Sequence, residues 1–90
     1  MKLYHINDFS PYAKIFPELS GVQLKVLILY VNLYKIDYIA LTLDIKTNTV
    51  CEHLKRIKEK YQVNSLFELK LLFNNRIQCF LLNLINRLNF

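Results

Sequence analysis

Proline and glycine are scarce in this chain of 90 residues, and tryptophan is absent. The two prolines and the single glycine, Pro11, Pro17 and Gly21, all precede residue 22, so the rest of the chain lacks the strongest turn signals. After that point apolar residues recur every three to four positions, a spacing typical of helices. The sequence therefore predicts an all-α fold with short joints.

Acidic residues are outnumbered, with 7 Asp and Glu against 12 Lys and Arg, which gives a net charge of +5. A basic balance favours a polyanionic partner. Hydrophobic residues make up 53% of the chain, which excludes a disordered tail and exceeds what one small core can bury. We expect one domain whose remaining apolar surface contacts a partner.

Cysteine and histidine are too few and too scattered to suggest a metal site. The chain has only Cys51, Cys79, His5 and His53, without a CxxC spacing, so we expect no structural zinc and no cofactor. His53 has no nucleophile and orienting carboxylate suggested nearby, so we expect no enzyme. An export signal and an apolar run of about 18 residues are also missing, which predicts a cytoplasmic protein without membrane contact.

A capping box marks the start of the first long helix. Ser20 is followed three residues later by Gln23, and the two side chains can satisfy each other's backbone donors. Residues 21 to 32 are apolar almost all round, which predicts a central helix. A joint follows between Asn32 and Ile36, with Asn32 as the residue that best tolerates a left-handed conformation.

Two further helices are predicted before residue 62. Asp37 can cap a helix of about two turns with Ile39, Ala40 and Leu43 on its inner face. After a tight connection over residues 44–46, Thr47 or Asn48 can cap a third helix. Its apolar positions form one inward stripe: Val50, Leu54, Ile57 and Tyr61.

The last helical stretch begins at a second capping box, Ser65 with Glu68, and buries Leu66, Leu69 and Phe73. We expect Asn74 and Asn75 to break or fray this helix. Apolar residues then continue at helical spacing to the C-terminus: Ile77, Phe80, Leu81, Leu84, Ile85 and Leu88. The whole pattern predicts a bundle of four to five helices with an extended C-terminal helix.

The outer face of the third helix is the best candidate for a functional surface. Positive charge is concentrated between residues 46 and 60, a segment that contains five Lys and Arg but only two Glu. A helix of this kind after a short helix and a tight joint suits the DNA major groove. The alternative is a solvated amphipathic helix. The N-terminal aromatics, Tyr4, Phe9, Tyr12 and Phe16, can stack on nucleic acid, but we expect them to cover the core.

From Leu19 to Leu69 the sequence resembles the LuxR/GerE-type helix-turn-helix domain without a gap. The family's Leu-Ser, Val-Leu and Ile-Ala pairs correspond to Leu19-Ser20, Val26-Leu27 and Ile39-Ala40, and Leu43 and Ile45 occupy its next apolar positions. Its most specific segment is matched by Thr49, Val50, His53, Ile57, Lys60, Val63, Ser65 and Glu68. Six positions depart from the family pattern: Gln23, Leu33 for a Gly, Lys35 and Lys46 for two Ser caps, Tyr38 for a Glu, and Cys51 for a basic residue.

The resemblance implies that residues Thr47 to Tyr61 form the recognition helix. Together with the outward face of this helix, it predicts that bases are read by Asn48, Cys51, Glu52 and Lys55. The predicted phosphate contacts are Lys46, Thr49, His53, Lys58 and Lys60. Glu52 either accepts a hydrogen bond from cytosine N4 or repels phosphates, depending on its orientation.

Three segments follow from these assignments: an N-terminal extension over 1–18, a helix-turn-helix DNA-binding domain over 19–73, and an apolar helix over 74–90. The resemblance implies a bacterial, nucleoid-associated transcriptional regulator of double-stranded DNA without its own sensor domain. We expect a homodimer through the C-terminal helix, or a heterodimer with another regulator. The alternative is a protein-interaction module that pairs with a full-length regulator and modulates it.

Overall fold

The computed structural model describes residues 9–88, which form five helices. In chain order they are α1 (Ser10–Ala13), α2 (Gly21–Val31), α3 (Ile36–Leu43), α4 (Thr47–Tyr61) and α5 (Leu66–Leu88). No strand occurs within these residues, so the all-α class with an extended C-terminal helix is confirmed. The predictions for Tyr4, His5 and the outer ends of the terminal segments lie outside the described residues.

Helix α2 is the centre of the fold, as its all-round apolar sequence predicts. It contacts α1, α3, α4 and α5, and Val26, Leu27 and Ile28 are fully buried. The predicted capping box starts the helix: the Gln23 amide N–H donates to Ser20 Oγ at 3.2 Å, and the Ser20 N–H donates to Gln23 Oε1 at 3.1 Å. A helix that packs on four neighbours needs apolar side chains on every side.

The joints between helices use left-handed residues that are not glycine. Leu33, rather than the predicted Asn32, has a positive φ of 70°, and Asp44 and Gln62 each have a φ of 56°. Asn32 instead ends α2 with its side-chain amide, which donates to the Ile28 carbonyl at 2.6 Å. For Leu33 the left-handed conformation costs about 1–2 kcal/mol, because its Cβ approaches the following carbonyl.

Two predicted N-caps are wrong. Helix α3 has Lys35 as its N-cap and α4 has Lys46, and neither side chain makes a capping hydrogen bond. Asp37 and Thr47 lie within the first turns instead, one residue or more inside the helix. The apolar spacing positions each helix, because the burial of Ile39 and Val50 contributes more than one cap.

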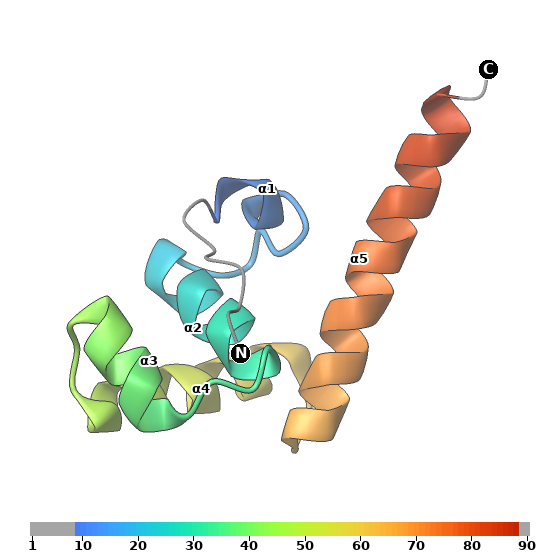
Figure 1. The fold of residues 1–90 in the computed structure, drawn as a ribbon. Coiled ribbons are helices and arrows are strands. Elements are labelled where there is room, and N and C mark those ends of the chain that lie inside the picture. The colour runs from blue at the N-terminus through green and yellow to red at the C-terminus, as the bar shows by residue number, and fades with distance from the viewer. Residues whose placement is uncertain (1–8, 89–90) are drawn as a thin grey trace.

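Helix α5 runs without a break through Asn74 and Asn75, so no joint or fraying occurs there. Its first turn is capped by Ser65 Oγ, which accepts from the Glu68 N–H at 3.1 Å, while the Glu68 carboxylate accepts from the Asn64 N–H. The C-terminal half of α5 projects beyond the other helices (Figure 1).

The segment before α2 belongs to the same core as the helices. Phe16 is 1% exposed, and its ring stacks on Phe73 of α5 with centroids 5.2 Å apart. Tyr12 stacks on the same Phe73 ring at 6.0 Å, and Phe9 is half-buried against the core. The prediction that Phe9, Tyr12 and Phe16 cover the core is therefore confirmed.

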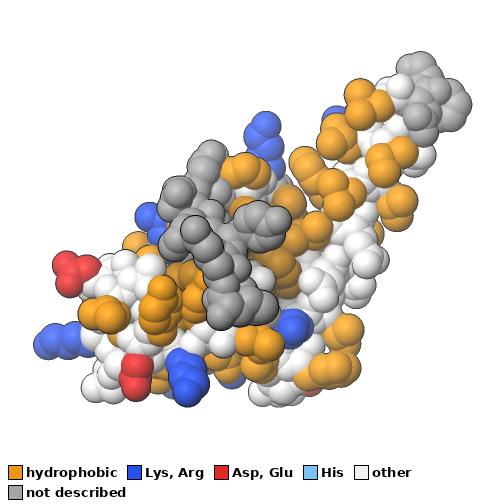
Figure 2. Space-filling model, viewed as in Figure 1, with side chains coloured by type: hydrophobic (Ala, Val, Ile, Leu, Met, Phe, Trp, Pro, Cys, Tyr) orange, Lys and Arg blue, Asp and Glu red, His pale blue; other side chains and the backbone are white. Residues whose placement is uncertain are grey.

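Apolar side chains also lie on the outside of the molecule. Figure 2 shows them along the projecting part of α5, where several large residues are 40% exposed or more. Even so, none of the helices in residues 9–88 combines the length and the apolar character that a membrane crossing requires.

Candidate nucleic-acid interface

Helix α4 separates an inner apolar face from an outer polar face. Val50 and Ile57 are fully buried, Leu54 is 5% exposed, and Tyr61 is half-buried at the end of the helix. These residues recur at intervals of four, three and four, so they share one side of the helix. The predicted inward stripe is confirmed, and α3 and α2 both pack on α4.

Four residues on the opposite side form a continuous exposed surface, which we name the outer strip: Asn48, Cys51, Glu52 and Lys55. Their spacings of three, one and three place them within about a third of the helix circumference. These are the residues that the sequence predicts as base readers, and the structure brings all four together. The Asn48 amide and the Lys55 ammonium are donors and the Asn48 and Glu52 oxygens are acceptors, so the outer strip offers both.

The five predicted phosphate residues are divided between the two edges of α4 and its N-cap. Lys46 is exposed at the N-cap, and Lys58 lies on one edge with its Nζ 5.9 Å from the centre of the Tyr30 ring. Thr49, His53 and Lys60 lie on the other edge. His53 is half-buried, and its Nδ1 is buried without a hydrogen-bond partner among the described residues. The structure does not bring these five side chains into one cluster.

Lys60 connects α4 to the start of α2. Its Nζ donates to the Glu18 carbonyl at 2.6 Å and to Gln23 Oε1 at 3.2 Å. The Gln23 oxygen thus accepts from both the Ser20 N–H and Lys60, as a carboxylate at this position would. The Lys60 ammonium therefore holds two helices together, and its orientation toward phosphate would require these bonds to break.

Arg56 is a residue of this surface that the predicted site omits. Its Nε lies 3.5 Å from Glu52 Oε1, and the two side chains are 63% and 57% exposed. An exposed pair at this i, i+4 spacing contributes only about 0.3–0.5 kcal/mol, so it separates easily when another anion approaches. The spacing of four residues between Glu52 and Arg56 on a helix is enough to predict this ion pair from the sequence.

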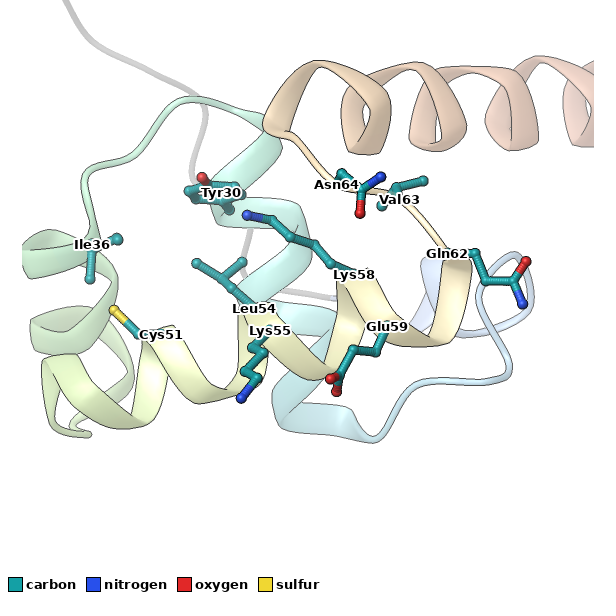
Figure 3. Close-up of a pocket in the computed structure, with 10 residues that line it drawn as sticks. All are labelled: Tyr30, Ile36, Cys51, Leu54, Lys55, Lys58, Glu59, Gln62, Val63 and Asn64. Atoms are coloured by element: carbon teal, nitrogen blue, oxygen red, sulfur yellow. The ribbon is translucent and has the colours of Figure 1, made fainter.

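A groove of about 430 Å³ borders the outer strip (Figure 3). Cys51 and Lys58 of α4 point into it toward Ile36 and Tyr30, whereas Lys55 and Glu59 point away from it. Residues 62–64 close its far end. The outer strip is therefore flanked by a hollow on one side, and Lys55 extends into the open space beyond the helix.

A cluster at the end of α4 fixes the position of α5. Arg76 of α5 donates to both carboxylate oxygens of Glu18, at 2.8 and 2.9 Å, and to the Ile15 carbonyl at 3.0 Å. The Tyr61 hydroxyl donates to Glu18 Oε1 at 2.9 Å, and the Arg76 guanidinium lies 4.9 Å from the Tyr61 ring centre. This cluster sets the angle between α4 and α5.

The same contacts shift the acidity of the groups involved. Hydrogen bonds from Arg76 lower the pKa of Glu18 from 4.5 to about 2. Burial, together with the bond to Glu18, raises the pKa of Tyr61, and the bond to Glu18 raises the pKa of Arg76. All three groups therefore keep their ordinary charge at neutral pH, and the cluster is structural.

Comparison of the chain with protein-family models, with curated protein sequences and with solved structures gives no match.

Proposed function

We propose that the protein is a sequence-specific DNA-binding transcriptional regulator that inserts α4 into the major groove and acts as a dimer. The observation that carries this proposal is the outer strip, whose four residues are all exposed on a helix whose other side is anchored by Val50, Leu54 and Ile57. An anchored helix with an exposed polar face can reach base edges in a groove about 12 Å wide.

The distribution of charge supports the same use of α4. Lys46 at the N-cap, Lys55 on the outer strip and Arg56 beside it are all exposed cations that phosphates can reach. Arg56 lies beside Glu52, so its positive charge offsets the negative charge of the carboxylate near DNA even when the pair is open, and the second Glu52 oxygen is left as an acceptor. Of the two roles that the sequence leaves open for Glu52, this pairing favours base reading.

The resemblance to the LuxR/GerE-type helix-turn-helix also supports the proposal. Leu33 occupies the position where that family has Gly, and it has the left-handed φ of 70° that Gly adopts without strain. Lys35 and Lys46 occupy the two family cap positions and are the N-caps of α3 and α4. The connection between α3 and α4 is three residues long, as a helix-turn-helix requires.

Selection of bound sequences from random double-stranded DNA, followed by gel-shift titration at several salt concentrations, tests the proposal. We expect binding that weakens steeply with salt and a Lys55→Ala variant that binds about 5- to 100-fold more weakly to the selected site. Lys14→Ala is the matched control, because Lys14 is exposed near α5 rather than α4 and its loss removes the same charge. No enriched sequence, or equal losses for both variants, would refute base reading by α4.

A protein-interaction module is the second candidate, and exposed apolar residues on and before α3 favour it. Leu41 is 79% exposed, Leu33 is 64% exposed, and Tyr38 is 51% exposed with its ring stacked 5.1 Å from Tyr34. In that case Leu41→Ser would weaken binding to a full-length regulator while Lys55→Ala would not. Opposite responses of these two variants distinguish the candidates.

A further inference from the structure

One apolar stripe runs along the whole of α5, and its exposure changes along the helix. Leu69 is 0% exposed and Phe73 is 8% exposed, whereas Phe80 and Leu84, on the same side, are 40% and 42% exposed. Leu88, at the end of the stripe, is 76% exposed. The domain's own core covers the first half of the stripe, and nothing in residues 9–88 covers the second half.

The uncovered half, which we name the distal stripe, lies on the projecting part of α5 (Figures 1 and 2). It consists of the exposed residues Phe80, Leu81, Leu84, Ile85 and Leu88, whereas Ile77, one turn earlier, still packs against the core. Between residues 77 and 88 the only charged residue is Arg87. Charges at the rim of an interface influence which partner binds. A segment with one charge does not attract a strongly acidic or basic partner, and it does not repel a second copy of itself.

The fold also determines which way a second copy can lie. In a parallel pair, the partner's α5 would run beside Leu69 and Phe73, where the rings of Phe16 and Tyr12 already pack. In an antiparallel pair centred on Leu84, Phe80 faces the partner's Leu88, so each helix stops short of the other copy's Ile77 and of the core on which Ile77 packs. Only the antiparallel arrangement leaves the domain core in place.

We infer that two copies of this chain pair antiparallel through the distal stripe, which holds the two α4 helices at opposite ends of the dimer. The inference rests on the proposed dimer, whose expected interface is the C-terminal helix, and adds the contacting residues and the direction of pairing. Each copy would bury on the order of 500 Å² of apolar surface, which lies near the lower limit of specific interfaces. Interfaces of this size are typical of weak pairs, so we expect an affinity in the micromolar range.

Sedimentation equilibrium without DNA tests the interface. We expect a wild-type dimer in the micromolar range and a Leu84→Lys variant whose dissociation constant rises at least tenfold. Leu82→Lys is the matched control: Leu82 is 60% exposed, lies two residues away, and is about 200° further round the helix, off the stripe. A wild type that stays monomeric at 100 µM, or equal effects of both variants, would overturn the inference.

A distance between two spin labels tests the direction. The label is attached to a Phe67→Cys variant, because Phe67 is 71% exposed in the first turn of α5. The two native cysteines, Cys51 and Cys79, are changed to serine so that only the new cysteine is labelled. At 1.5 Å per residue an antiparallel pair places the two labels about 50 Å apart, whereas a parallel pair places them within about 20 Å. The short distance would refute the antiparallel pair.

The outcomes separate this inference from DNA binding. A monomer that still selects a DNA sequence would refute the paired α5 helices and leave base reading by α4 standing. A dimer with the long label distance that selects no DNA would refute the proposed function and leave the pairing standing.

Discussion

The two halves of α5 carry the same apolar stripe but have different surroundings. In the N-terminal half, Leu69 and Phe73 complete the core of the domain beneath Phe16. In the C-terminal half, Phe80, Leu84 and Leu88 continue on the same side of the helix beyond the domain. Helical periodicity therefore predicts which side of α5 is buried, but it does not distinguish burial within a chain from burial between chains.

The largest effect is expected when one leucine of the stripe is replaced by alanine in each half of α5. Leu69→Ala should lower the free energy of unfolding by about 3 kcal/mol at any protein concentration, because it leaves a cavity in the core. Leu84→Ala should cost less than about 1 kcal/mol in dilute protein, and the cost should increase with protein concentration as the dimer forms. Urea unfolding at two protein concentrations measures both. Similar, concentration-independent losses would contradict the distinction.

The boundary between the halves is fixed by Glu18 and Arg76, and pH tests that contact. The folded pKa of Glu18 is about 2, below the ordinary 4.5, so its contribution to stability is complete above about pH 4.5 and is lost as the pH falls toward 2. Glu18 is 43% exposed, so solvent screening limits this contribution to about 1 kcal/mol.

Glu18→Gln should therefore destabilise the protein at pH 7 and have a much smaller effect near pH 2, as followed by urea unfolding at each pH. Glu59→Gln is the control, because Glu59 is an exposed carboxylate on α4 outside the cluster. A loss from Glu18→Gln that is the same at both pH values would argue against the charged pair with Arg76.

The smallest effect is expected at the junction itself. Asn74 is exposed within the continuous helix, where Asn is a poorer helix former than Ala. Asn74→Ala should raise the free energy of unfolding by about 0.5 kcal/mol, and Asn74→Gly should lower it by a similar amount. Circular dichroism during urea unfolding reads both changes. Two variants indistinguishable from the wild type would indicate that the halves are not joined by a stable helix.

Local patterns in the sequence were enough to predict most of the fold. The capping box of Ser20 and Gln23 and the stripe of Val50, Leu54 and Ile57 depend on residues within a few turns of each other. The outer strip follows from that stripe, because the side opposite a buried face is exposed. These features needed no knowledge of how the helices pack.

The features that were missed depend on contacts between distant residues. Lys60 meets the Glu18 carbonyl across 42 positions, and Arg76 meets the Glu18 carboxylate across 58, so no spacing in the sequence indicates either contact. The joint after α2 lies where the sequence predicts it, but its left-handed residue is Leu33 rather than Asn32, because a side-chain bond to the Ile28 carbonyl keeps Asn32 at the helix end.

Because α5 is one continuous helix across Asn74 and Asn75, a change in its number of residues both rotates and displaces its C-terminal half relative to the domain. Each residue inserted between the core and the distal stripe would turn that stripe by about 100° and move it by about 1.5 Å relative to α4. Seven inserted residues, close to two full turns, would restore the original direction to within about 20°. In a paired molecule the number of residues in α5 would therefore set the twist between the two α4 helices, and through it the phase on the DNA helix at which both can bind.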